Sequence, residues 1–161
     1  MNILFVCTGN VSRSFLAERL LRRELESRGM EGFFVASAGL DTRPGIPGDP
    51  VMIEYLREKD IEAGDHEARL INEKDVRWAD LILVMETVHL QMIESRWPWA
   101  AGKTKLFLEY AALGPKGDEI IDPFGKTQYH YRLAQAQIEK AVRLLAEKLF
   151  SSPKNGLHAQ D

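Results

Sequence analysis

The chain has 161 residues, of which 45% are hydrophobic and 28% are charged, and its formal net charge is −3. This composition is typical of one globular domain and excludes the disordered and fibrous classes. It provides no overall positive charge with which to hold nucleic acid or an anionic membrane, so neither is expected as a partner.

The first segment, Asn2–Cys7, is a continuous apolar run of the kind found in parallel strands that are buried on both faces. A polar, turn-prone segment follows it, Thr8–Ser14, and after that leucines recur at helical spacing until about Gly29. Strand, loop and helix in this order are typical of the start of an α/β fold.

The rest of the chain alternates in the same way. The sequence predicts a strand at 33–36, a loop at 39–50, a helix at 51–59, a short helix from Asn72, a strand at 81–85, a helix through Leu90 and Ile93, a short strand at 105–108, and a helix at 129–150 that directs Leu133, Ile138, Val142, Leu145 and Leu149 toward the core. These elements predict a single-domain α/β fold with a doubly wound, four-stranded parallel sheet and helices on both faces. Residues 1–150 are expected to form this domain and 151–161 a flexible tail.

Three absences narrow the class further. The longest apolar runs, Ile3–Cys7 and Leu81–Met85, have five residues each, whereas a membrane-spanning helix needs roughly 20. The start on an apolar run without a basic leader predicts a cytoplasmic protein. Cys7 is the single cysteine, which excludes an intramolecular disulfide and a multi-cysteine zinc site.

Ligands of such sheets bind at the carboxyl ends of the strands, where Cys7 and the loop after it are expected. Backbone N–H groups of a loop that wraps from a strand to a helix can converge with the helix N-terminus into an anion site, and Gly9 permits the tight curvature. Arg13 offers a planar fork for two oxygens of a phosphate-like group. The same positive field favours the nucleophilic thiolate of Cys7. A lone cysteine at a strand end is most often a small buried hydrophobe, but the whole set, Cys-x5-Arg with a glycine between, favours a nucleophile in an oxyanion cradle.

The segment Val6–Ser14, with Ala17 and Glu18 after it, resembles the signature of the low-molecular-weight protein tyrosine phosphatase family. The resemblance continues, in the family's order, at 37–39, 66–69, 79–85 and 122–124. It implies a metal-independent phosphatase without a cofactor, which acts on a phosphorylated protein and binds phosphate, sulfate or similar oxyanions.

The resemblance also implies residue roles. Cys7 would attack phosphorus, Arg13 would clamp the phosphate, and Asp122 would protonate the leaving atom and then activate water. The phosphate-binding loop would consist of Thr8, Gly9, Asn10, Val11, Ser12 and Ser14, supported by hydrogen bonds among Asn10, Ser14, Ser37 and His66. Without the resemblance, Asp122 would be read as a turn residue, because Asp-Pro is common in loops, and His66 as an exposed loop histidine.

The sequence departs from the usual family pattern at several positions. Ser12 stands where many members have a second cysteine, and Phe15 replaces a common proline without touching the loop chemistry. Glu86 stands where mammalian-type members have aspartate, which keeps an acidic partner near the mouth of the cleft. Arg43 falls near an aromatic position of the cleft, and Gly125 follows Phe124 in place of a second aromatic residue.

These departures bear on the substrate. The substrate cleft is predicted to include Val11, Arg43, Glu86 and Phe124. The form Asp-Pro-Phe-Gly also resembles the protein-arginine phosphatase branch of the family, whose members typically have threonine at the position of Val11. Because Val11 is apolar, we expect phosphotyrosine as substrate, with phosphoarginine as the alternative. An arsenate reductase on the same fold is disfavoured, because it needs several cysteines. A non-catalytic phosphate-binding module is also disfavoured, because it would need neither Cys7 nor Asp122, and both are present.

Overall fold

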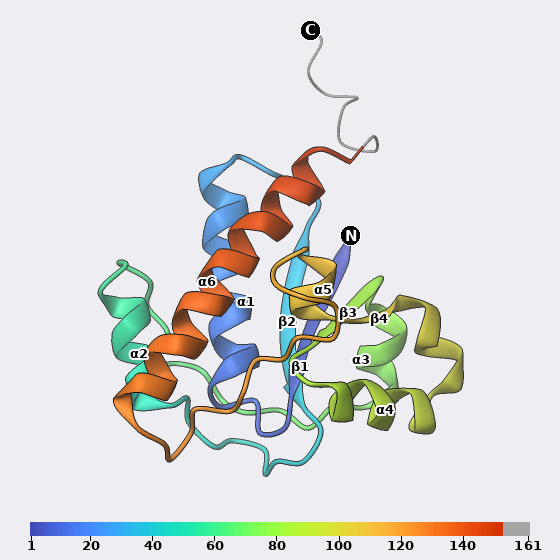
Figure 1. Ribbon diagram of the computed structural model, residues 1–161, viewed down its shortest axis with the longest axis horizontal. Coiled ribbons are helices and arrows are strands. Elements are labelled where there is room, and N and C mark those ends of the chain that lie inside the picture. Colours follow the sequence, from blue (N-terminus) through green and yellow to red (C-terminus); the bar gives the residue numbers. More distant parts are fainter. Residues whose placement is uncertain (153–161) are drawn as a thin grey trace, which may run out of the picture.

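Four parallel strands form the sheet of the computed structural model, which describes residues 1–152 (Figure 1). They are β1 (Asn2–Cys7), β2 (Phe34–Gly39), β3 (Leu81–Val84) and β4 (Thr104–Leu106), in the spatial order β2-β1-β3-β4. The order reverses direction between β1 and β3. A crevice is therefore expected at the carboxyl end of β1, where ligands bind in open α/β sheets.

Helices cover both faces of the sheet. Those of the described part of the chain are α1 (Arg13–Ser27), α2 (Pro50–Arg57), α3 (Glu73–Trp78), α4 (Thr87–Arg96), a 3-10 helix η1 (Pro98–Lys103), α5 (Phe107–Tyr110) and α6 (Gln128–Phe150). α1 and α6 pack together on one face, and α3 and α4 cover the other (Figure 1).

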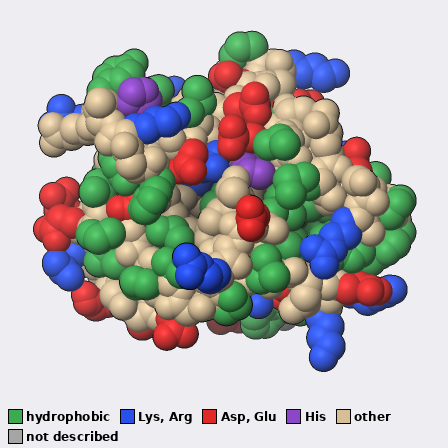
Figure 2. All heavy atoms as spheres, turned by 90° about the horizontal axis from the view of Figure 1, so that it is seen from below, with side chains coloured by type: hydrophobic (Ala, Val, Ile, Leu, Met, Phe, Trp, Pro, Cys, Tyr) green, Lys and Arg blue, Asp and Glu red, His purple; other side chains and the backbone are tan. Residues whose placement is uncertain are grey.

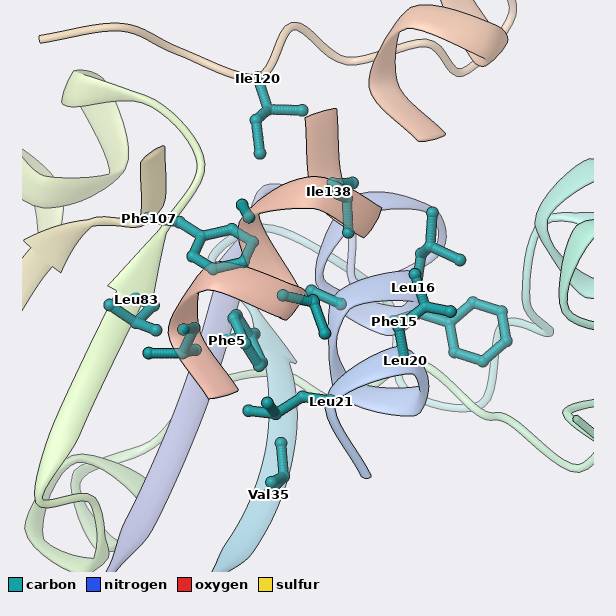
Figure 3. Packing of buried hydrophobic residues seen from close by; sticks show 14 of the residues in the cluster. Phe5, Phe15, Leu16, Leu20, Leu21, Val35, Leu83, Phe107, Ile120 and Ile138 are labelled. Atoms are coloured by element: carbon teal, nitrogen blue, oxygen red, sulfur yellow. The ribbon is translucent and has the colours of Figure 1, made fainter. Parts of the chain in front are cut away.

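The core follows from the alternation of side chains along β1. Phe5 points to the α1 and α6 side, where its ring packs edge-on against Phe107 with centroids 5.0 Å apart. Figure 3 shows both rings with Leu21 and Ile138 in one group, whereas Phe15 points away from it. Leu4 and Val6 point to the opposite face and pack with residues of α3 and α4. Both faces of β1 are thus buried, which fixes the position of Cys7 at its end.

The predicted fold class is confirmed, and so is the short helix at Asn72, whose side chain forms a capping box with Asp75. Two strand predictions are wrong in extent. β2 runs from Phe34 to Gly39 and not over 33–36. Its last residues, Ser37 to Gly39, are small, but their backbone groups pair with β1, and this pairing does not require large side chains. β4 spans Thr104–Leu106 and not 105–108, since Phe107 already begins α5.

One core assignment is also wrong. Leu133 is 41% exposed, although the other four predicted core residues of α6 are buried. At 100° per residue, Leu133 lies about 140° around the helix from Ile138, which places it on another face. Of the predicted tail, residues 153–161 lie outside the described residues. Within residues 1–152, no helix is both long and apolar enough to span a bilayer.

Candidate active site

The loop between β1 and α1 turns its carbonyl groups outward. The carbonyls of Cys7, Thr8 and Val11 accept hydrogen bonds from the backbone N–H groups of Leu40, Asp41 and Asp49, all on the segment after β2. N–H and C=O of a trans peptide point in opposite directions, and the described chain contains no cis peptide. The N–H groups that follow these carbonyls therefore point toward the centre of the loop, as an anion cradle requires.

Gly39 allows this segment to approach the loop so closely. A Cβ atom there would lie 2.8 Å from the Thr8 carbonyl oxygen and 3.0 Å from the Gly9 carbonyl carbon. Any larger residue would push the loop away from β2.

Asn10 holds the loop from within. Its backbone is left-handed, with φ of 54°, a conformation that asparagine tolerates better than most residues. Its side-chain amide donates to Ser14 Oγ at 2.9 Å and to Ser37 Oγ at 2.8 Å, and its Oδ1 accepts from the Arg69 backbone N–H at 2.9 Å. These side-chain bonds connect Asn10 to the first turn of α1, to β2 and to the segment at Arg69.

His66 fastens the same residue from outside. Its Nε2 lies 2.7 Å from the Asn10 carbonyl oxygen, and because a carbonyl only accepts, this nitrogen carries the proton. Burial lowers the pKa of His66, which keeps the ring neutral. Phe15 stacks on it with ring centroids 4.0 Å apart. Phe15 therefore supports, through His66, the residue that holds the loop.

Cys7 lies at the base of the cradle. Its Sγ is 3.0 Å from Ser14 Oγ and 3.3 Å from the Asn10 backbone nitrogen, which donates to it. A hydroxyl and an N–H group aimed at sulfur stabilise its anionic form. The side chain is nearly buried, yet it lines the cavity described below. This is the position of a nucleophile that only a ligand in the cradle can reach.

Arg13 is 1% exposed, so its charge must be compensated and its orientation fixed by neighbouring groups. Its Nη1 donates to Glu86 Oε2 at 2.6 Å and to the Ile120 carbonyl at 2.7 Å. Its Nη2 lies 3.7 Å from Asp122 Oδ2. With Nη1 occupied, Nε and Nη2 form the remaining edge, which has the spacing of two oxygens of one phosphate.

Asp122 lies on the segment between α5 and α6, above Arg13. Its side chain is 47% exposed, and its Oδ1 accepts a hydrogen bond from the Phe124 backbone N–H at 3.1 Å. Gly125, with φ of 73°, provides the left-handed turn that follows. One carboxylate oxygen is thereby fixed, while the other faces Arg13 and the cavity.

A cavity of about 620 Å³ opens above Cys7. Its apolar lining includes Val11, Ile46, Pro47 and Phe124, and the charged groups Asp41, Arg43, Asp49 and Asp122 also border it. Figure 2 views the end of the molecule at which β1 finishes. Near the middle of this face, acidic side chains lie beside basic and histidine side chains, with hydrophobic side chains around them.

The structure brings most of the predicted site residues together. Cys7, Thr8, Gly9, Val11, Ser12, Arg13, Arg43, Asp122 and Phe124 line the cavity, and Asn10, Ser14, Ser37 and His66 form one network behind the loop. Glu86 is placed differently from the expected cleft wall, because its carboxylate is bonded to Arg13. No group of three or more histidine, cysteine, aspartate or glutamate side chains in residues 1–152 is placed to hold a metal.

Sequence reasoning missed a buried carboxylate beside the loop. Asp49 Oδ2 accepts hydrogen bonds of 2.6 Å from both Ser12 Oγ and the Tyr131 hydroxyl, and its Oδ1 accepts from the Val51 backbone N–H at the start of α2. Ser12 therefore makes no cap for α1, whose N–H groups stay available for an anion. The only signal in the sequence was an aspartate before Pro50, which is typical of a helix start.

It also missed His89, which is fully buried on α4 under the loop. Its Nε2 lies 2.9 Å from Thr8 Oγ1, and its Nδ1 accepts from the Glu86 backbone N–H at 3.1 Å. No local pattern in the sequence pairs residues 81 positions apart.

Several known proteins are similar to this chain in sequence. The model of the family "Low molecular weight phosphotyrosine protein phosphatase" matches residues 2–155. A relative from Geobacillus stearothermophilus named protein-arginine-phosphatase is 38% identical over 91% of this chain and 95% of its own. The low molecular weight protein-tyrosine-phosphatase Wzb of Escherichia coli strain K12 is 35% identical over 92% of this chain and 95% of its own.

Two solved structures are similar to this chain in fold as well as in sequence. The YwlE arginine phosphatase mutant with a phosphorylated active-site serine has a TM-score of 0.88 and 32% identity, and the match covers 96% of this chain and 99% of that chain. Wzb from Escherichia coli K30 in complex with sulphate has a TM-score of 0.80 and 33% identity, over 92% of this chain and 97% of that chain.

Proposed function

The chain belongs to the low molecular weight phosphotyrosine protein phosphatase family, and on that premise we propose that it hydrolyses phosphotyrosine in proteins through a cysteinyl-phosphate intermediate. It is a cysteine-based hydrolase of phosphorylated substrates. The observation that carries the proposal is the position of Cys7 Sγ at the base of the cradle, in a cavity that Arg13 and Asp122 also line.

In the first step the thiolate of Cys7 attacks phosphorus in line with the bond to the leaving oxygen. The Nε and Nη2 groups of Arg13 and the inward N–H groups of the loop stabilise the charge on the non-bridging oxygens, as a metal would. A phenolate leaves poorly unless a proton arrives in the transition state, and Asp122 is the acid that supplies it. The products are cysteinyl-phosphate and the tyrosine hydroxyl.

In the second step water attacks the cysteinyl-phosphate. Asp122, now a carboxylate, takes a proton from this water, and the sulfur leaves as thiolate. Ser14 Oγ at 3.0 Å and the Asn10 N–H at 3.3 Å stabilise the departing thiolate. One carboxylate thus serves as acid and then as base, which regenerates the starting state.

The walls of the cavity support an aryl leaving group. Val11 and Phe124 present apolar surface above Cys7, and Ile46 and Pro47 extend it outward. A flat aromatic ring fits such walls without leaving polar groups unpaired.

Phosphoarginine is the second candidate. It is favoured by the carboxylates of Asp41 and Asp122 at the cavity, which suit a cationic guanidinium, and by the name of the Geobacillus relative. Kinetics with matched phosphotyrosine and phosphoarginine peptides decide between the two. A higher kcat/KM for the phosphoarginine peptide would overturn the proposed preference.

The mechanism itself is tested with p-nitrophenyl phosphate and no added metal. We expect turnover by the wild-type chain and a loss of at least about a thousandfold in Cys7→Ser. Activity retained in Cys7→Ser would overturn the cysteinyl-phosphate mechanism. We further propose a cytoplasmic phosphoprotein as the partner, and binding of phosphate or sulfate in the cradle as competitive inhibitors.

A further inference from the structure

Thr8 begins the phosphate-binding loop and its exposed side chain lines the cavity. Among the hydrogen bonds of residues 1–152, its hydroxyl takes part in one, with His89 Nε2 at 2.9 Å. A hydroxyl can donate or accept, so the meaning of this contact depends on where the histidine proton lies.

The position of the proton on His89 follows from its other nitrogen. The Glu86 backbone N–H points at Nδ1 at 3.1 Å, and since a backbone N–H can only donate, Nδ1 carries a lone pair. Burial and the charge of Arg13 lower the pKa of His89 to about 4, although the carboxylates of Glu86 and Asp122 oppose the shift. The ring is therefore neutral near pH 7, and its proton is on Nε2.

It follows that His89 donates to Thr8 Oγ1. The proton of the Thr8 hydroxyl is not used in this contact and remains for a group in the cavity. The opposite tautomer would have made Thr8 donate to the ring and would have left only lone pairs toward the substrate. His89 thus makes Thr8 a hydrogen-bond donor.

The neighbours of His89 show which part of a substrate meets this donor. His89 Nε2 lies 3.6 Å from Glu86 Oε2, and Glu86 and Asp122 both contact the guanidinium of Arg13, so the Thr8–His89 pair lies on the side of the cavity where the acid is located. Arg13 and the loop N–H groups already serve the non-bridging oxygens. The atom left for Thr8 is the bridging atom, which gains charge as its bond to phosphorus breaks.

We propose that Thr8 donates a hydrogen bond to the leaving oxygen of a phosphate ester and that His89 is a positioning residue which directs this donor. The inference rests on the proposed function and extends it to selectivity. An ester oxygen has lone pairs that accept such a bond. The bridging nitrogen of phosphoarginine has its lone pair delocalised into the guanidine and accepts poorly, so the donor favours phosphotyrosine.

The test is Thr8→Val, which keeps the shape of the side chain and removes the hydroxyl. We expect kcat/KM for phosphotyrosine peptide to fall about tenfold, and kcat/KM for phosphoarginine peptide to fall by less than about threefold. Across aryl phosphates, the loss should grow as the leaving phenol becomes more basic. Thr8→Ser, which restores the hydroxyl, should recover most of the activity.

Thr127→Val is the matched control, because Thr127 is another exposed threonine bonded to a histidine, with Oγ1 2.8 Å from His130 Nδ1, but outside the cavity. It should leave all rates unchanged. His89→Leu should reproduce the loss of Thr8→Val, and the double variant should be no slower than Thr8→Val, since His89 acts through Thr8. Should His89→Leu fail to fold, the Thr8 variants still decide.

The outcomes separate this inference from the proposed function. If the wild-type chain does not hydrolyse aryl phosphates, the proposed function fails. If it does, but Thr8→Val is as active as wild type or slows all substrates equally, only the role of Thr8 is overturned.

Discussion

The floor of the cavity, formed by Asn10, Arg13 and Ser14, and its rim, formed by Asp122 and Phe124, are built in opposite ways. On the floor, Asn10, Ser14 and Arg13 are buried, and each is bonded to residues from other elements. On the rim, Phe124 is 60% exposed, and Asp122 is fixed only through one oxygen. The difference shows that the groups for phosphorus chemistry are immobilised by the fold, while Asp122 and Phe124, which face the leaving group from the rim, are carried by a surface segment.

Removal of a floor contact should therefore have the largest effect. Asn10→Ala deletes three side-chain hydrogen bonds and leaves alanine in a left-handed conformation. We expect kcat/KM on p-nitrophenyl phosphate to fall about a hundredfold and the free energy of unfolding to fall by about 3 kcal/mol. Urea denaturation and steady-state kinetics measure both.

The matched control is Asn72→Ala, because Asn72 also bonds a backbone N–H through its side chain, but at the cap of α3. It should cost about 1 kcal/mol of stability and no activity. Equal activity in Asn10→Ala and Asn72→Ala would show that the contacts of Asn10 on the floor are not needed for catalysis.

The buried His89 gives the floor a pH dependence. In the unfolded chain this histidine takes up a proton near pH 6.5, whereas in the folded protein its pKa is about 4. Between these values the unfolded state binds more protons, so stability falls as the pH is lowered from about 6.5 to 4 and is unaffected by this group above 6.5.

The contribution lost over that window is about 3 kcal/mol. We therefore expect the unfolding free energy of wild type to fall by that much more than that of His89→Gln between pH 7.5 and pH 4. If the unfolding free energies of the two proteins fell equally with pH, His89 would not have a lowered pKa in the folded protein.

On the rim, Asp122→Ala should have an effect that depends on the leaving group. We expect kcat/KM to fall about 50-fold for phosphotyrosine peptide, whose leaving group needs a proton, and less than about tenfold for p-nitrophenyl phosphate. Asp118→Ala, a carboxylate on the same segment, is the control. If Asp122→Ala slows both substrates equally, Asp122 is not the acid.

The smallest effect is expected from Val11→Thr, which exchanges one methyl group for a hydroxyl on the cavity wall. The ratio of kcat/KM for phosphoarginine over phosphotyrosine peptide should rise about fivefold, because a hydroxyl can bond a guanidinium and apolar surface cannot. An unchanged ratio would show that other residues of the cavity lining determine the choice between the two substrates.

The same contrast explains what the sequence could predict. β1 and the loop after it are encoded locally, by an apolar run followed by Gly9 and Arg13: β1 lies where the sequence predicts it, and the loop ends earlier than predicted because α1 begins at Arg13. The contacts of Asn10 with Ser14, Ser37 and His66 were implied by the family resemblance, and they lie where it implied.

The partners that were not predicted are held by tertiary structure alone. Asp49 meets Tyr131, 82 positions away, and His89 meets Thr8. Neither residue type signals burial, since aspartate and histidine are common at surfaces. The end of β2 was missed for a related reason: Ser37 is held in the ladder by pairing with Phe5 and not by its own propensity.

The ion pairing of Arg13 has a consequence for the end of the catalytic cycle. Its guanidinium donates to Glu86 at 2.6 Å and lies 3.7 Å from Asp122, so part of its positive charge is already compensated where inorganic phosphate is formed. The product phosphate is then held by the inward N–H groups of the loop and by a cation whose charge Glu86 partly compensates. We expect this pairing to weaken the hold on the product, which favours the release of phosphate at the end of the cycle.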